Sequence, residues 1–391
     1  MRCRIRGVQS TCRGVRDDER RATRFGAPLF SAEAELIVTE RRKNSLLLLT
    51  TVCLTLLLCE AALRLWHGRP LLELDNRRAA TRFDLPGIGR YDSALGWSLK
   101  DRVDTPRFHT VEDGIRRNGP AQAGMRPGNI LVVGSSFTSG VEVADDESWP
   151  AQLETLTGTP VDNAAVPAFA LDQIVLRAEQ LLPVARPRLL LVGMTRTSID
   201  WTGDALRINP KPYFTVDGGT LRVHNIPVPS PAQALPFEPV ISALAYSYLL
   251  DRVMARLDPG GWYSRRVRVA NDPVDISCRL LQRLKSRADA LATRVMLVSE
   301  ISAQKAQASD RPPPDLAKVE ECARATGYRV VATFDAFRRA FAADAARFRS
   351  YYVINKSGPL THYSAVGNRL VAEMVAGALA SDARLPVGGE R

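Results

Sequence analysis

The part of the chain that follows residue 128 alternates between short aliphatic runs and segments with helical spacing. Near-continuous aliphatic runs predict strands that helices cover on both faces. The predicted strands are residues 129–134, 159–163, 188–193, 294–300 and 328–334. The predicted helices lie near residues 148–157, 170–182, 274–292, 314–326 and 365–380. This alternation predicts a doubly wound parallel α/β sheet, in which functional sites lie beyond the carboxyl ends of the strands.

Residues 201–270 interrupt the alternation. The stretch 213–224 predicts a β-hairpin, because two strand-like runs flank an Asp-Gly-Gly turn. A proline-rich segment follows over 226–239, and one amphipathic helix is predicted near 240–257. The insertion comes directly after a predicted strand, where it can cover or shape a site.

Residues 45–66 are almost entirely apolar and are long enough to span a membrane as a helix. Glu60 and Arg64 are four residues apart and can pair on that helix, and Trp66 suits the membrane interface. Basic residues at 41–43 place the N-terminus in the cytoplasm by the positive-inside rule. A cleaved signal peptide is the alternative, but no clean cleavage site follows the apolar core, so we favour an uncleaved single-pass anchor.

Positive charge is concentrated before the anchor. The chain has 53 Lys and Arg against 42 Asp and Glu, for a formal charge of +11. Eleven basic and six acidic residues in 1–44 give +5, which leaves +6 for the remainder. The exported part has no dense basic run, so nucleic acid is not an expected partner. Residues 1–37 are predicted to be disordered, unless translation begins at Val38.

These patterns divide the chain into five parts. They are a cytoplasmic leader (1–44), the anchor (45–66), a polar connector (67–128), the α/β domain (129–380) and a tail (381–391).

Few residues are available for metal or imidazole chemistry. The four histidines are His67, His109, His224 and His362. The six cysteines lack paired CxxC spacing, and acidic residues and histidines do not cluster at ligand spacing, so we expect no metal and no cofactor. Cys278 and Cys322 follow the anchor and either form a disulfide or remain buried thiols. Arg116 and Arg117 can bind an anionic substrate, but solvated surface arginines are commoner, so we interpret both as solvated.

Residues 131–140 read LVVGSSFTSG, a strand followed by a tight turn that contains Ser136. A serine at such a turn is exposed, and its hydroxyl can lie near helix amides. This stretch and several later ones resemble the SGNH/GDSL hydrolases of the bacterial membrane-anchored type, over about residues 45–380. The matching positions are 131–140, Glu142, 145–147, 149–150, 163–173 and 361–368. The resemblance implies a flavodoxin-like three-layer α/β/α sandwich and the hydrolysis or transfer of esters, often acetyl groups on carbohydrate.

The resemblance also implies roles for individual residues. Ser136 matches the family nucleophile, and His362 matches the general base that takes its proton. The backbone amides of Ser136 and Ala165 match the oxyanion donors. The family's asparagine donor is absent, and Thr195 or Thr197 is its candidate replacement.

The acid of the family triad is missing from its usual place. The position three residues before the histidine is Pro359, and the next is Leu360, so neither can orient an imidazole through its side chain. The sequence therefore predicts at best a Ser–His dyad. Asp335 and Asp200 are the candidate substitute acids.

Two functions are compatible with these residues. The first is an exported ester hydrolase or acetyl transferase, anchored in the bacterial inner membrane and acting on envelope carbohydrate. The second is a non-catalytic domain that keeps the fold and binds glycan or an envelope partner. The retained Ser136 and His362 favour the first, and the missing acid and asparagine favour the second. Protein partners are left open.

Overall fold

The structure is a computed structural model. It describes residues 30–72, 87–207, 209–234, 237–258, 262, 266–269, 272–355 and 358–382. The chain forms two compact units, residues 1–71 and 72–391. Residues 1–29 of the predicted leader and 383–391 of the predicted tail lie outside the described residues.

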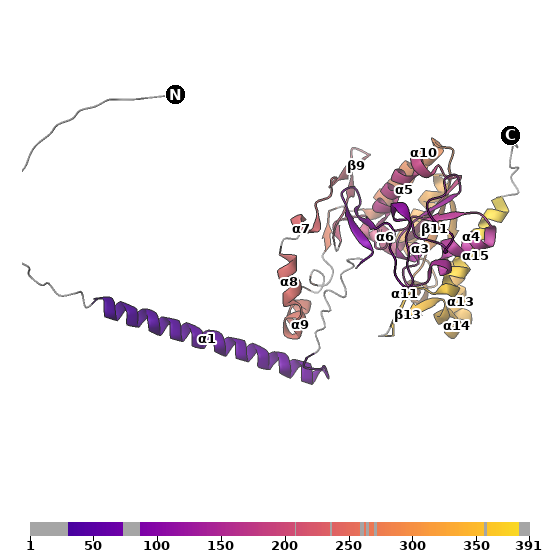
Figure 1. Cartoon of the computed structure of the whole chain (residues 1–391). Helices are drawn as coiled ribbons and strands as arrows, with labels where there is room; N and C mark the ends of the chain where they lie inside the picture. Colours follow the sequence, from indigo (N-terminus) through magenta and orange to yellow (C-terminus); the bar gives the residue numbers. More distant parts are fainter. Residues whose placement is uncertain are drawn as a thin grey trace, which may run out of the picture. The chain divides into compact units, whose positions relative to one another are not determined.

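The first unit contains one long helix, α1, which runs from Phe30 to Trp66 (Figure 1). Within it, Thr39–Trp66 is long and apolar enough to cross a membrane, with a mean hydropathy of 2.3 over its most apolar window. All leucines of this segment except Leu63 are exposed, a pattern that suits contact with lipid. The predicted pair between Glu60 and Arg64 is present, with Oε1 and Nε 2.6 Å apart.

The second unit is built on a five-stranded parallel sheet, which confirms the predicted fold class. Its strands are β3 (Ile130–Val133), β4 (Val161–Asn163), β5 (Leu189–Thr195), β11 (Arg294–Glu300) and β12 (Arg329–Ala332). Their spatial order is β12-β11-β5-β3-β4, and all neighbours are parallel. Counted along the chain, this is the 2-1-3-4-5 order of flavodoxin-like sheets. The order reverses between β3 and β5, so the sheet has its switch point beside the end of β3.

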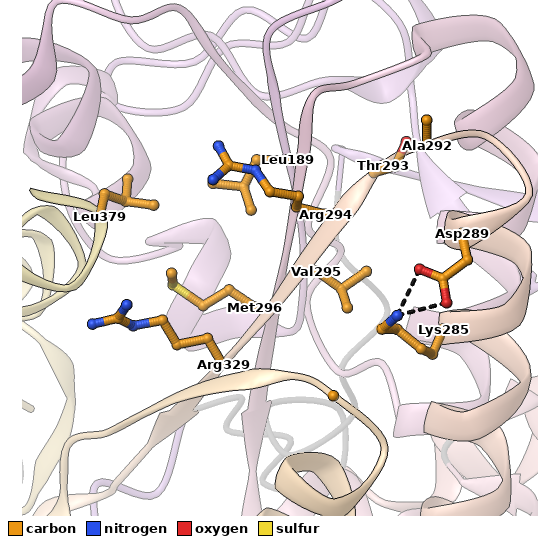
Figure 2. Close-up of a pocket in the computed structure, with 11 residues that line it drawn as sticks. Leu189, Lys285, Asp289, Ala292, Thr293, Arg294, Val295, Met296, Arg329 and Leu379 are labelled. Atoms are coloured by element: carbon orange, nitrogen blue, oxygen red, sulfur yellow. Dashed lines mark hydrogen bonds and ion pairs between the residues drawn. The ribbon is translucent and has the colours of Figure 1, made fainter. Parts of the chain in front are cut away.

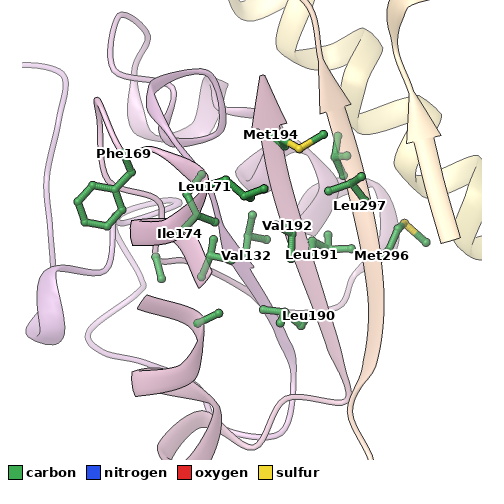
Figure 3. Close-up of a cluster of buried hydrophobic side chains, with 14 of the residues drawn as sticks. Val132, Phe169, Leu171, Ile174, Leu190, Leu191, Val192, Met194, Met296 and Leu297 are labelled. Carbon is green, nitrogen blue, oxygen red and sulfur yellow. The ribbon is translucent and has the colours of Figure 1, made fainter. Parts of the chain in front are cut away.

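Helices cover the sheet because each carries an apolar stripe that the buried strands match. The long ones are α4 (Trp149–Thr157), α5 (Leu171–Ala185), α10 (Pro273–Asp289), α12 (Pro314–Ala325) and α15 (Ala365–Asp382). Helix α10 contacts α5 and α12, whereas α4 contacts α15. Figure 3 shows the core between α5 and the sheet, where Leu171 and Ile174 face Val132 and Leu190.

A disulfide joins two of these helices. Cys278 of α10 and Cys322 of α12 are bonded, with their Cα atoms 5.5 Å apart. Of the two states that the sequence left open, the structure has the disulfide. Such bonds persist in oxidising compartments.

Residues 67–128, predicted to be a polar connector, contribute to the core from residue 88 onward. Strands β1 (Gly89–Asp92) and β2 (Gly96–Leu99) form a hairpin, and a short 3-10 helix follows at Glu112–Gly114. Leu95, Leu99 and Ile115 are completely buried. Their apolar positions are too widely spaced to give a periodic signal, so the sequence pattern did not reveal them.

The insertion matches its prediction in part. The hairpin is β8 (Tyr213–Asp217) with β9 (Thr220–His224). The helix predicted near 240–257 is instead two helices, α8 (Glu238–Leu244) and α9 (Tyr248–Leu257). They separate because Ser247 caps α9, its hydroxyl accepting from the amide of Leu250 at 3.2 Å. The other described elements are β6 (Asp204–Arg207), β7 (Asn209–Pro210), α7 (Pro231–Ala234) and β10 (Arg266–Arg268).

Short elements complete the carboxyl edge of the sheet and the region after β12. They are α3 (Ser136–Ser139), a 3-10 helix (Asp145–Glu147), α6 (Arg196–Trp201), α11 (Ala303–Ala308), α13 (Phe334–Ala343), α14 (Ala345–Ser350), β13 (Tyr352–Ile354) and β14 (Leu360–Tyr363). Strands β13 and β14 pair as an antiparallel hairpin.

Candidate active site

Ser136 is the first residue of α3, directly beyond the carboxyl end of β3. The turn is tight because Gly134 precedes it and Gly193 of β5 lies beside it. A Cβ atom on either glycine would collide with the side chain of Thr138. The two glycines therefore make room for Thr138, which is completely buried beneath the turn.

Glu300 holds this turn through hydrogen bonds. It ends β11 and is completely buried, and its Oε1 accepts hydrogen bonds from Thr138 Oγ1 and Trp149 Nε1, both at 2.9 Å. Its Oε2 has no hydrogen-bond partner within the described chain. Burial raises the pKa of Glu300 to about 8, because the two hydrogen bonds offset only part of the cost of removing a carboxylate from water. The group is therefore mostly protonated at neutral pH.

The structure brings Ser136 and His362 together. His362 lies on β14, and its Nε2 is 2.8 Å from Ser136 Oγ. The ring of Phe137 packs on the imidazole with centroids 4.8 Å apart, which restricts the orientation of the ring. The two residues are separated by 226 positions, so only the fold juxtaposes them. A hydroxyl and an imidazole at this distance can pass a proton between them.

A third group completes the arrangement on the other side of the imidazole. Glu142 Oε2 lies 3.2 Å from His362 Nδ1 and accepts hydrogen bonds from Thr361 Oγ1 at 2.5 Å and from the His362 amide at 3.2 Å. The ring nitrogen and the carboxylate are at ion-pair distance without the alignment of a straight hydrogen bond. Catalytic contacts often have this looser geometry before substrate binds.

Glu142 is held ionised. Partial burial by itself raises its pKa, but the hydrogen bonds from His362 and Thr361 and the charge of His362 outweigh that effect. The net result lowers the pKa of Glu142 to about 2. A carboxylate that stays charged can keep the Nδ1 proton in place and stabilise an imidazolium.

The two predicted substitute acids are elsewhere. Asp200 pairs with Arg266 and Arg268, at 2.9 and 2.7 Å. Asp335 is exposed in the first turn of α13 and makes no ion pair with His362. The carboxylate that contacts the imidazole is Glu142, which matches the family pattern in sequence but was not predicted to have a role. Its signal was its place six residues after Ser136, whereas the family acid is expected just before the histidine.

The predicted oxyanion donors differ in whether they already make a hydrogen bond within the protein. Within the described chain, the Ser136 amide has no hydrogen-bond acceptor, as expected at the start of a helix. The Ala165 amide donates to Asn163 Oδ1 at 3.2 Å. Thr195 Oγ1 caps α6 and contacts Ser198 Oγ at 3.0 Å, while Thr197 is exposed on the same helix.

Ala168 is a feature that sequence reasoning missed. It lies in the loop after β4 and has φ of 64°, a left-handed conformation that is uncommon for alanine. Its amide also has no acceptor within the described chain. Strain of this kind accumulates at functional sites, but the sequence contains no glycine there to signal it.

Ser136 does not line any of three surface cavities of about 400 to 470 Å³. One, of about 400 Å³, is lined by Leu189, Arg294 and Arg329, which are the first residues of β5, β11 and β12 (Figure 2). It therefore lies at the amino edge of the sheet, opposite the nucleophile. Among the described residues, no group of three or more His, Cys, Asp or Glu side chains could hold a metal ion.

No family model and no curated protein matches this chain. Solved structures with a similar arrangement include an acetyl xylan esterase, with 9% identity and a TM-score of 0.39 over 64% of this chain and 99% of that one. A second is a member of the lipolytic G-D-S-L family from Veillonella parvula, with 11% identity and a TM-score of 0.35 over 64% of this chain and 97% of that one. A third is a psychrotrophic esterase from Pseudoalteromonas, with 11% identity and a TM-score of 0.36 over 65% of this chain and 98% of that one.

Proposed function

We propose that the second unit is a serine ester hydrolase or acyl transferase that uses Ser136, His362 and Glu142 as a triad. One observation carries this proposal: His362 contacts Ser136 Oγ through Nε2 and Glu142 through Nδ1, at 2.8 and 3.2 Å. A nucleophile, a base and a group that orients the base are the three parts of this chemistry.

The reaction proceeds in two transfers. Ser136 Oγ bonds to the acyl carbon of the ester while its proton passes to His362 Nε2. The carbon–oxygen bond to the alcohol then breaks, and the alcohol leaves with that proton. Water, or a sugar hydroxyl in a transferase, repeats the sequence on the acyl-enzyme and restores Ser136. Glu142 holds the imidazole and stabilises its positive charge in both halves.

The charge that develops on the acyl oxygen requires hydrogen-bond donors. The Ser136 amide serves as one donor in this proposal, because it belongs to the nucleophile itself and lacks an acceptor within the described chain. The Ala168 amide also lacks an acceptor there and is the candidate for a second donor. Ala165, Thr195 and Thr197 are weaker candidates. The first two already make hydrogen bonds, and the third is exposed.

The proposal places this reaction outside the cytoplasm, on a bacterial inner-membrane anchor, with acetyl esters of envelope carbohydrate as the substrate class. Three observations support it. Helix α1 has the length and composition of a membrane span, basic residues 41–43 lie at the amino end of that span, and the disulfide between Cys278 and Cys322 suits an oxidising compartment.

The test is ester hydrolysis by the full chain in detergent, with 4-nitrophenyl acetate and an acetylated oligosaccharide as probes. Ser136→Ala and His362→Ala should each lower the rate by a factor on the order of 10⁴ or more. Ser286→Ala and His224→Ala are matched controls on α10 and β9, and each should leave the rate unchanged. Activity that survives both site substitutions would refute the proposal.

A non-catalytic binding domain is the second candidate, favoured by the hydrogen bonds that already occupy the Ala165 amide and the Thr195 hydroxyl. It predicts no ester turnover above buffer by the folded wild-type chain. Binding of an acetylated glycan that does not depend on Ser136 would then support it.

A further inference from the structure

Arg116 is a completely buried arginine close to the proposed triad, although the sequence suggested a solvated one. Its guanidinium lies over the ring of Phe108, 4.6 Å from the ring centre. Its own amide donates to the Asn163 carbonyl at 2.8 Å, which joins this segment to the end of β4. Burial lowers the pKa of Arg116 to about 10, against the opposing charge of Asp145, so the group stays charged at neutral pH.

The guanidinium donates mainly to backbone carbonyls. Nη1 donates to the carbonyls of Ser139 and Gly140, and Nη2 donates to those of Val143 and Arg107, the last two at 2.7 and 3.3 Å. Three of these four carbonyls belong to residues 139–143. They flank Glu142 on both sides, so one rigid group holds both ends of the segment that carries the carboxylate.

The backbone of residues 139–143 leaves space for the Arg116 guanidinium. Gly140 has φ of 67°, and a Cβ atom there would lie 2.6 Å from Arg116 Nη1. Glycine is therefore needed both for the left-handed backbone and for the close approach of the guanidinium. The remaining nitrogen, Nε, lies 3.6 Å from Asp145 Oδ1, which helps to balance the buried charge.

We propose that Arg116 is a positioning residue for the triad: it fixes the segment 139–143 so that Glu142 stays in contact with His362. This inference rests on the proposed function, since it concerns the same site. Lysine cannot replace the arginine, because a single ammonium cannot span carbonyls on both sides of Glu142 as the planar fork does.

The kinetic test is a double-mutant cycle in the full chain, with the variants Arg116→Met, Glu142→Gln and the pair. Arg116→Met should lower kcat by about 10- to 100-fold with little change in KM, the loss expected from a misplaced catalytic group. In the Glu142→Gln background the same change should lower kcat by less than about threefold, because its target is already absent. Equal losses in both backgrounds would show a merely structural role and overturn the inference.

Arg177→Met is the matched control. Arg177 is also buried and donates to a backbone carbonyl, but that carbonyl belongs to Asp113, outside residues 139–143. It should change stability without changing kcat. Gly140→Ala keeps Arg116 but crowds its guanidinium, so it provides a second variant if Arg116→Met fails to fold. It should reproduce the selective loss of kcat, and an unchanged kcat would contradict the inference.

A readout without turnover separates this inference from the proposed function. Hydrogen exchange of the peptide that contains residues 139–143 should accelerate in Arg116→Met and not in Arg177→Met. If the wild type has no esterase activity but the exchange difference appears, the proposed function fails, whereas the role of Arg116 in fixing residues 139–143 is supported. If hydrogen exchange of this peptide is the same in Arg116→Met and the wild type, the proposed role of Arg116 is refuted.

Discussion

The two edges of the parallel sheet differ in how their polar groups are arranged. At the carboxyl edge, Ser136, His362 and Glu142 converge within hydrogen-bond or ion-pair distance. At the amino edge, a cavity of about 400 Å³ contains Arg294 and Arg329, and the nearby Lys285 is paired with Asp289 (Figure 2). The amino-edge cavity has volume and charge, but the described residues that line it include no nucleophile with an adjacent base.

The difference shows that empty volume alone does not identify a site. Parallel strands direct their carboxyl ends, the turns after them and the helix N-termini to one edge, so amides and side chains from distant segments meet there. The buried groups beneath that edge, Glu300 and Arg116, hold two consecutive segments in place, 136–139 and 139–143. Substitutions at both edges can test whether function depends on the carboxyl edge only.

After the substitutions of Ser136 and His362, the largest effect at the carboxyl edge is expected from Glu142→Gln. Loss of the charge leaves the imidazole without its stabilising partner, so kcat should fall by a factor on the order of 10²–10⁴. Glu179→Gln is the control, because Glu179 forms an ion pair with Arg283 on the helical face, at 2.7 Å. The measurement is the esterase kcat of the wild type, Glu142→Gln and Glu179→Gln. Equal rates for the wild type and Glu142→Gln would show that Glu142 is not part of the triad.

A smaller effect, on stability, is expected from Glu300→Gln. The native pKa of about 8 lies above the ordinary value of 4.5, so the native state binds more protons than the unfolded state between those pH values. The free energy of unfolding of the wild type should therefore decrease as pH rises from 4.5 to 8, at up to roughly 1.4 kcal/mol per pH unit.

The glutamine variant keeps an acceptor for Thr138 and Trp149 but cannot ionise, so its stability should decline less over the same range. Urea unfolding at several pH values measures both curves. Parallel curves for the two proteins would show that Glu300 does not carry this proton in the native state.

The smallest effect is expected at the amino edge. Arg294 is exposed at the start of β11, and no proposed step uses it. Arg294→Ala should therefore leave kcat and KM within about twofold of wild type and shift stability by no more than about 0.5 kcal/mol. A large loss of activity in this variant would contradict the comparison and make the cavity of Figure 2 a second functional site.

Local patterns predicted most of the framework. The five strands and their five long helices lie within a few residues of their predicted bounds, because continuous aliphatic runs and helical spacing are properties of neighbouring residues. The same reasoning merged α8 and α9, since a single capping serine outweighed the amphipathic pattern. It also missed the buried residues of 88–118, which are apolar at irregular intervals.

The sequence by itself determined the alternating α/β architecture, the membrane-length segment and the candidates Ser136 and His362. Tertiary structure alone decided that these two side chains touch, that Glu142 rather than Asp200 or Asp335 faces the imidazole, and that Cys278 bonds Cys322. The physical reason is separation. These contacts join residues that are 226, 220 and 44 positions apart, and their distances depend on how strands and helices pack.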